Sequence, residues 1–292
     1  MNKILVIGSM NMDYTIYCEN FPKDGETIYG INRIVQPGGK GANQACAAGK
    51  ANFVPVSFIS SCGKDADGEN IENLIKSLGI TAFFKKNDNV PTGNATIFVN
   101  GNSENQIIII AGANALLTKE DIPLNLLEEY EYIILQNEIP NETNEYIIKE
   151  AHKLGKKVIY NPAPYRPFDD SIYPCIEYFV VNEVELACSS NTESIEKGIK
   201  VMLEKGVKNL IVTLGAKGSL LANKDGVISV PANKVKAIDT VAAGDTYVGY
   251  FVASIASGHE PKKAMEIASI ASSITVTRKG SIISIPFGEE VI

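Results

Sequence analysis

The feature that most constrains this chain is a short turn sequence followed directly by an apolar stretch. The turn reads Asp239-Thr240-Val241-Ala242-Ala243-Gly244-Asp245, and the apolar stretch runs from Tyr247 to Ile255. Small residues and a glycine before a helical pattern predict a turn whose backbone N–H groups lack acceptors at a helix N-terminus. Such N–H groups, together with the positive end of the helix dipole, bind anions such as phosphate. The segment therefore predicts a phosphate-binding turn.

Asp245 stands at the start of that predicted helix, where a carboxylate has two uses. It can cap the helix or complement its dipole, which contributes about 1 kcal/mol. It can also act as a general base that takes a proton from a hydroxyl attacking the bound phosphate. The motif alone does not distinguish these two roles.

Composition excludes several classes of partner. The chain has 292 residues, 45% hydrophobic and 21% charged, which allows one large or two medium domains with a real core. Its net charge of −7, without a Lys/Arg run, argues against nucleic-acid binding. The first apolar run, Ile4 to Ile7, is short and ends at Gly8, which indicates a strand and neither a signal peptide nor a membrane helix.

Cysteines and histidines give no sign of a metal site. The five cysteines are scattered without CxxC spacing, which indicates reduced thiols in a cytoplasmic protein. The two histidines, His152 and His259, lie in polar segments and are expected at the surface. There is no GxSxG, so a serine hydrolase lacks support, and no GxGxxG follows the first strand, which disfavours a Rossmann dehydrogenase.

The first strand leads into a polar segment in which Asn11 and Asp13 could be turn formers or hydroxyl-binding side chains. Residues 14–35 contain strand-like stretches broken by Pro22 and glycine, without a helix. Residues 92–110 predict a hairpin around Asn100-Gly101. These two blocks are expected to form a small sheet outside the main one.

A second glycine-rich motif, Gln36-Pro37-Gly38-Gly39-Lys40-Gly41-Ala42-Asn43-Gln44, precedes an alanine-rich helix predicted over 45–51. Glycines that open a helix allow a polar ligand to approach the backbone closely. The motif is not a Walker A loop, because Lys40 is followed by glycine and not by Ser or Thr. A plain tight turn is the alternative interpretation.

Elsewhere the pattern alternates between strands and helices, which predicts a parallel sheet covered by helices on both faces. Strands are predicted at 54–60, 132–135, 157–160, 178–181, 209–213, 219–222 and 227–230, and helices at 69–78, 119–129, 143–154, 192–205 and 262–277. Polar residues collect after these strands, and their convergence on one sheet edge favours a cleft over independent caps. They are Asn137, Glu138, Asn161, Asn182, Glu185, Thr213 and Gly215.

Together these stretches resemble the ribokinase-like (PfkB) family of carbohydrate kinases over almost the whole chain. The two glycine motifs carry the resemblance, supported by Asn161-Pro162-Ala163-Pro164 and Thr277-Arg278-Lys279-Gly280. The resemblance implies an α/β fold: a three-layer α/β/α sandwich with a mainly parallel central sheet and a small β-sheet lid. Residues 1–292 would form a single domain with lid insertions at about 14–35 and 92–110.

The resemblance also implies an activity: ATP-dependent phosphorylation of the 5-hydroxyl of D-ribose, giving D-ribose 5-phosphate and ADP. Asp245 would be the general base, with an anion hole at Ala242, Ala243 and Gly244. The sugar would be bound by Asn11, Met12, Asp13, Gly39, Lys40, Gly41, Ala42, Asn43, Glu138 and Asp245. ATP would be bound by Asn182, Thr213, Leu214, Gly215, Ala216, Lys217, Gly218, Gly244 and Asp245.

By the same resemblance, Glu185 would help to position Mg²⁺ and phosphate. An activating K⁺ would be held, mostly through backbone carbonyls, by Asp239, Val241, Thr275, Arg278, Gly280 and Ser284. Two lids would pack together in a homodimer, and no nucleic acid or membrane would be a partner.

Two alternatives remain open. The chain could phosphorylate 2-deoxyribose or another pentose, or it could be a non-catalytic regulator that binds sugar or nucleotide. The intact Asp245 and anion turn favour a kinase over a regulator. One departure from the family pattern stands near the site: Asn137 is polar where an apolar residue is expected.

Overall fold

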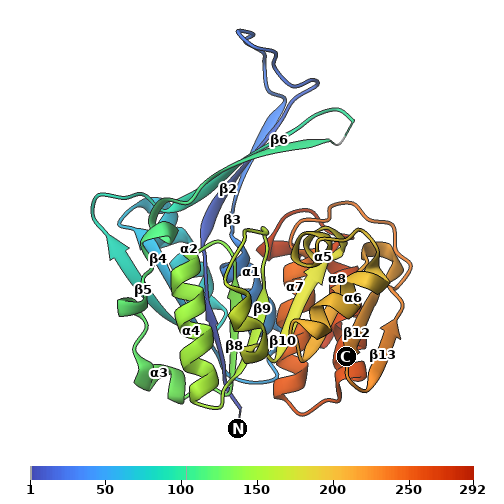
Figure 1. Ribbon diagram of the computed structural model, residues 1–292. Helices are drawn as coiled ribbons and strands as arrows, with labels where there is room; N and C mark the ends of the chain where they lie inside the picture. Colours follow the sequence, from blue (N-terminus) through green and yellow to red (C-terminus); the bar gives the residue numbers. More distant parts are fainter. Residues whose placement is uncertain (1, 103) are drawn as a thin grey trace.

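A computed structural model describes residues 2–102 and 104–292, and these form two sheets (Figure 1). The main sheet has nine strands in the order β13-β12-β11-β10-β9-β8-β1-β4-β5. All neighbouring pairs from β11 to β5 are parallel, and β12 and β13 add an antiparallel edge. Its strands are β1 (Ile4–Ile7), β4 (Val56–Gly63), β5 (Thr81–Asn87), β8 (Tyr132–Gln136), β9 (Lys157–Asn161), β10 (Tyr178–Asn182), β11 (Asn209–Thr213), β12 (Ser219–Asn223) and β13 (Gly226–Val230).

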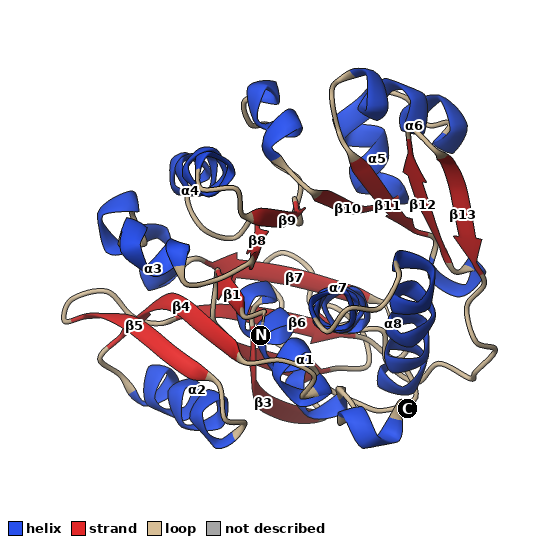
Figure 2. Cartoon of the chain, turned by 90° about the horizontal axis from the view of Figure 1, so that it is seen from below, coloured by secondary structure: helices blue, strands red, loops and turns tan. Residues whose placement is uncertain are grey.

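Helices cover both faces of the main sheet (Figure 2). Alternate residues of β1 belong to different cores: Ile4 and Val6 pack on one face, and Leu5 and Ile7 on the other. One face is covered by α1 (Lys40–Ala51), α2 (Ala66–Ser77), α7 (Ala243–Ala256) and α8 (Pro261–Thr275). The other is covered by α3 (Leu124–Glu128), α4 (Asn141–Lys153), α5 (Glu183–Ser190) and α6 (Ile195–Glu204). The expected three-layer α/β/α sandwich is confirmed.

The order of the strands identifies where a ligand site is expected. From β1 the chain builds β4 and β5 on one side, and then returns to place β8, β9, β10 and β11 on the other. The strand order therefore reverses between β1 and β8, and open α/β sheets bind ligands outside the carboxyl ends of strands at such a point.

The small sheet has four strands in the order β3-β2-β6-β7 and rises from the body as a separate layer (Figure 1). Its strands are β2 (Asn11–Tyr17), β3 (Asn32–Gly38), β6 (Gly93–Val99) and β7 (Asn105–Ile110). The predicted small sheet and its hairpin are thus confirmed. Its strands begin earlier and end later than residues 14–35, so Asn11 and Asp13 lie on β2 and are not turn residues.

Several predicted boundaries were wrong. The helix predicted over 45–51 begins at Lys40, so the second half of the glycine motif is helical. The helix predicted over 119–129 is a 3₁₀ turn at Lys119–Asp121 and a short α3, because Pro123 lacks the N–H that a continuous helix requires. Strand β5 and helix α5 were not predicted.

Candidate active site

The turn that was predicted to bind phosphate lies in front of α7. The N–H of Ala243, one of the expected anion-hole residues, donates to the carbonyl of Thr240 at 3.3 Å and is not free for an anion. Ala242 adopts the left-handed conformation, with φ of 60°, and the helix begins at the next residue. Within the described residues, the N–H groups of Gly244 and Asp245 donate to no protein acceptor. Gly244 is exposed, and a Cβ at that position would meet nothing within 4 Å. The turn therefore presents two free N–H groups and open space to an anion.

The carboxylate of Asp245 is buried, with 6% of its surface exposed, and is held by two side-chain amides. Asn43 donates to Oδ2 at 2.9 Å, and Gln44 donates to Oδ1 at 2.9 Å. Helix α7 lies close enough to α1 for these contacts because Gly249 has no side chain. A Cβ there would come within 2.5 Å of the Cβ of Ala47.

A network of buried amides supports Asp245 from behind. Gln44 accepts a hydrogen bond from Gln136 at 2.8 Å, and its own amide nitrogen also lies 3.1 Å from Oδ1 of Asn161. Gln44 and Gln136 are fully buried. Gln136 and Asn161 hold the amide of Gln44 in place, and Gln44 in turn fixes the orientation of the Asp245 carboxylate. No role was predicted for Gln44 or Gln136, although Gln44 belongs to the glycine motif.

The glycine motif brings α1 against the loop after β1. Gly39 has φ of 89°, and a Cβ at Gly41 would lie 2.5 Å from the backbone nitrogen of Ser9. Ser9 accepts hydrogen bonds from the N–H groups of Gly41 and Ala42, while the N–H of Lys40 donates to Glu138 at 3.0 Å. The backbone donors of residues 40–42 are therefore already used by the protein. Ser9 is a site residue for which no role was predicted.

Three predicted sugar-binding side chains, those of Asn11, Asp13 and Glu138, gather at the base of β2. Asn11 is held by Asn114, whose amide donates to its Oδ1 at 2.8 Å; nothing in the sequence pointed to Asn114, which lies 103 residues away. Glu138 accepts a hydrogen bond from Ser9 at 2.5 Å. Burial, together with the charges of Glu138 and Asp245, raises the pKa of Asp13 to about 7.

The pKa of Lys40 is affected by the same group of negative charges. Burial acts to lower the pKa of its ammonium, but the carboxylates of Asp245, Glu138 and Glu185 outweigh that effect and raise it. Lys40 therefore stays protonated close to the phosphate-binding turn, where a cation would stabilise a transferring phosphate.

Two predicted sugar-binding residues have side chains elsewhere. Met12 alternates with Asn11 and Asp13 along β2, so its side chain packs in the hydrophobic core. Ala42 is also part of that core. Only their backbone atoms can contribute to the site.

The predicted nucleotide residues surround the carboxyl ends of β10 and β11. Asn182 and Glu185 form a reciprocal capping box at the start of α5, with hydrogen bonds of 2.8 and 2.9 Å. Burial raises the pKa of Glu185. Gly215, Ala216 and Lys217 form an exposed 3₁₀ turn, and Lys217 pairs with Glu183 at 3.7 Å.

The predicted cation segment is drawn together by Asp239. Its Oδ1 accepts a hydrogen bond from the N–H of Val241 at 3.0 Å, and its Oδ2 from the N–H of Gly280 at 2.9 Å. The N–H of Arg278 donates to the carbonyl of Thr275 at 3.0 Å, and its side chain pairs with Glu290. Ser284 is buried nearby on the segment after Gly280. The predicted cation ligands therefore offer oxygen atoms only, which is the donor type that hard cations prefer.

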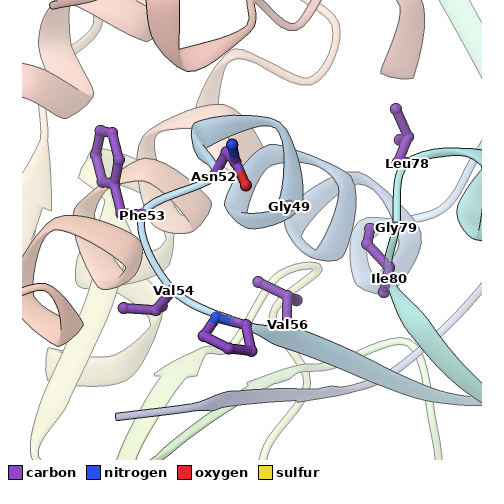
Figure 3. A pocket seen from close by; sticks show the side chains of 9 residues that line it. Gly49, Asn52, Phe53, Val54, Val56, Leu78, Gly79 and Ile80 are labelled. Atoms are coloured by element: carbon purple, nitrogen blue, oxygen red, sulfur yellow. The ribbon is translucent and has the colours of Figure 1, made fainter. Parts of the chain in front are cut away.

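A cavity of about 370 Å³ lies at the opposite, amino end of the main sheet (Figure 3). It is lined by Gly49, Asn52, Phe53, Val54, Pro55, Val56, Leu78, Gly79 and Ile80. Asn52 is its only polar side chain, so it offers little to bind a sugar or a phosphate. Among the described residues, no three His, Cys, Asp or Glu side chains gather to hold a metal ion.

Comparison with known proteins decides between the classes that this geometry allows. The profile of the pfkB family of carbohydrate kinases matches residues 1–287. The chain belongs to this family. The kinase is 37% identical to a deoxyribokinase of Salmonella typhi over 296 residues, which covers 98% of this chain and 96% of the relative.

Two solved structures are similar over nearly their full length. Ribokinase of Thermotoga maritima has a TM-score of 0.94 and 40% identity, covering 100% of the kinase and 98% of that chain. Ribokinase of Arabidopsis thaliana, solved with ribose and ATP, has a TM-score of 0.91 and 30% identity, covering 99% and 97%. The kinase is therefore similar both to ribokinases and to a deoxyribokinase, and these identities do not separate the two substrates.

Throughout the part of the kinase that the structure describes, no helix combines the length and the apolar character needed to cross a bilayer.

Proposed function

We propose that this kinase transfers the γ-phosphoryl group of ATP to the 5-hydroxyl of D-ribose. The observation that carries the proposal is the position of Asp245, a buried carboxylate held in place by Asn43 and Gln44 next to two free N–H groups at the start of α7. The similarity to ribokinases, one of which binds ribose and ATP, supports D-ribose as the acceptor.

In the proposed reaction, Asp245 takes the proton of the 5-hydroxyl as that oxygen attacks the γ-phosphorus. The bond from phosphorus to the β,γ-bridging oxygen breaks, and ADP leaves with those electrons. The N–H groups of Gly244 and Asp245, together with Lys40, stabilise the charge on the transferring phosphoryl group. Asn11, Asp13 and Glu138 hold the other hydroxyls, which fixes the attacking oxygen in line.

Two ions complete the proposed site. Mg²⁺ would enter with ATP and neutralise phosphate charge. Glu185, a buried carboxylate three residues after Asn182, would hold its water ligands. K⁺ would be held by Asp239 and by oxygen atoms of Val241, Thr275, Arg278, Gly280 and Ser284, and it would supply positive charge behind the phosphate-binding turn.

The proposal is tested by measuring ADP release with Mg-ATP and K⁺ in the presence of D-ribose, 2-deoxy-D-ribose, D-fructose or no sugar. Turnover that depends on D-ribose is expected. A preference for 2-deoxy-D-ribose would keep the mechanism and replace the substrate. Absence of turnover with every sugar would favour the regulator, and ADP release that is independent of sugar would contradict the proposed acceptor.

We expect K⁺ to activate turnover several-fold over Na⁺ at equal ionic strength, because the segment around Asp239 corresponds to the one that the resemblance to ribokinase-like kinases assigns to K⁺. The Asp239→Asn variant should lose most of this difference, since it removes the one negative charge of the set. Initial rates in KCl and NaCl measure the effect. Equal rates in the two salts for the unaltered kinase would remove the cation from the proposal.

A homodimer through the small sheet is also proposed. Strand β7 forms an edge of that sheet, and Ile107, Ile108, Ile109 and Ile110 are all between 50% and 59% exposed. Successive residues of a strand face opposite sides, so both faces of this edge are apolar and uncovered, which is typical of an interaction surface.

Light scattering should give the kinase twice the mass of one chain, and Ile108→Lys should give the mass of one chain. Leu124→Lys, which adds the same charge at an exposed residue of α3, serves as the control and should stay dimeric. A single-chain mass for the unaltered kinase would contradict the dimer.

A further inference from the structure

Asn137, the polar residue at an expected apolar position, connects the loops that follow β8 and β9. It is fully buried. Its backbone N–H donates to the carbonyl of Ala163 at 3.1 Å, and its side-chain amide donates to the carbonyl of Pro164 at 3.0 Å. Its Oδ1 accepts a hydrogen bond from the hydroxyl of Tyr160 at 3.3 Å. An apolar side chain here would leave the carbonyl of Pro164 without this donor.

Arg166 completes the connection from the second loop. Its Nη2 donates to the carbonyl of Asn137 at 2.6 Å and to the carbonyl of Ile139 at 2.7 Å. These two bonds use both hydrogens of that nitrogen, so the contact of 3.3 Å to Oδ1 of Asn137 is secondary. The two carbonyls lie on either side of Glu138. One guanidinium nitrogen therefore fixes the backbone on both sides of that carboxylate.

Arg166 does not neutralise Glu138. Among the described residues, the two side chains form no ion pair, and the only hydrogen bonds to the Glu138 carboxylate come from Ser9 and the N–H of Lys40, both at Oε2. Its Oε1 accepts no hydrogen bond from the described part of the protein, so it is free for a sugar hydroxyl. The charge of Glu138 is thereby kept for the substrate.

We propose that Arg166, together with Asn137, is a positioning residue that holds Glu138 in its sugar-binding orientation. The inference rests on the proposed function, because it assigns to Glu138 a contact with the acceptor sugar. Without Arg166, the carbonyls of Asn137 and Ile139 lose a shared charged donor. The turn between β8 and α4 can then rotate, and the Glu138 carboxylate turns away from Ser9 and Lys40.

The test compares Arg166→Met and Arg166→Lys with the unaltered kinase. Arg166→Met should raise the KM for the sugar about tenfold, as expected for the loss of the charged hydrogen bond between Glu138 and the sugar. The kcat and the KM for ATP should change less than about twofold. Arg166→Lys should recover part of the loss, because an ammonium can still donate to the two carbonyls. Lys149→Met removes a cation from α4, where Lys149 pairs with Asp169 at 3.1 Å, and should change none of these constants.

The combination with Glu138→Gln separates positioning from general stability. In the Glu138→Gln background, Arg166→Met should raise the sugar KM less than about twofold further, because the residue through which it acts is already altered. An unchanged sugar KM in Arg166→Met, or the same tenfold rise in both backgrounds, would overturn the proposal. If Arg166→Met does not fold, Asn137→Leu replaces it and should give the same selective rise.

Failure of the proposed function and failure of the positioning proposal give different results. Failure of the proposed function would appear in the unaltered kinase, as the absence of sugar-dependent ADP release, before any variant is measured. Calorimetric titration with each sugar then reports binding without turnover. Weaker sugar binding by Arg166→Met supports the positioning of Glu138, and equal binding overturns it.

Discussion

Replacement of Asp245 by Asn is expected to reduce kcat by about 10²- to 10⁴-fold, which is the contribution of a general base, because the amide cannot accept the proton. Sugar and ATP binding should be largely kept, because the anion turn and the residues that contact the other hydroxyls are untouched. Initial rates and calorimetric titration of the two substrates measure the two effects. Near-normal turnover would remove Asp245 from the role of base.

The same variant should also lose about 1–3 kcal/mol of unfolding free energy. Asn43 and Gln44 each donate to one oxygen of Asp245, and an Asn side chain offers only one oxygen. Its NH₂ group would therefore face a donor. Asp225→Asn, at an exposed hairpin turn, is the control and should change neither turnover nor stability.

The second large effect concerns Asp13 and pH. Its pKa is about 7 in the folded protein, against 3.8 ordinarily. Between about pH 4 and pH 7 the folded state therefore keeps a proton that the unfolded state has released. Because the folded state binds more protons, its stability falls as the pH rises through this window and then stays constant. The full effect amounts to at most about 4 kcal/mol.

Asp13→Asn should remove this dependence. The variant is expected to be more stable than the unaltered kinase at pH 8, and the difference should disappear toward pH 4. It should also bind sugar about 10- to 100-fold more weakly, since it loses hydrogen bonds to a charged acceptor. Denaturant unfolding at several pH values measures the stability, with Asp24→Asn, an exposed substitution, as control. A difference in stability that stays the same from pH 4 to pH 8 would refute the assignment.

The fold was predictable to the extent that local patterns determine it. The strands β1, β8, β9, β10 and β11 are apolar runs between polar or glycine-rich segments, so their positions could be predicted to within a few residues. Helix α1 was predicted to start late because glycine has a low helix propensity, although the first turn of this helix is stabilised by packing against the loop after β1. Helix α5 was missed because it follows β10 directly, and because its capping residues, Asn182 and Glu185, were interpreted only as ligand-binding residues.

The site was predictable only where its residues lie in recognisable motifs. Asp245 and the residues of the glycine motif stand in such motifs. The bond from Asn114 to Asn11 spans 103 residues, and the bond from Gln136 to Gln44 spans 92. Pairings of this kind depend on how the elements pack, which no local pattern in one sequence encodes. The role of Asn137 likewise depends on packing, because its hydrogen-bond partners lie in the loop after β9.

Strand β2 belongs to the small sheet, yet its first three residues include the proposed sugar ligands Asn11 and Asp13, and the fourth, Tyr14, is hydrogen-bonded to Asp67 of α2. Asp245, by contrast, stands on α7 in the body. Any change in the tilt of the small sheet that moves Asn11 and Asp13 relative to Asp245 would be thermodynamically linked to occupancy of the proposed sugar pocket, because a sugar that binds one tilt better must favour that tilt. Arrival of the acceptor and shielding of the phosphate-binding turn from water would then be one equilibrium.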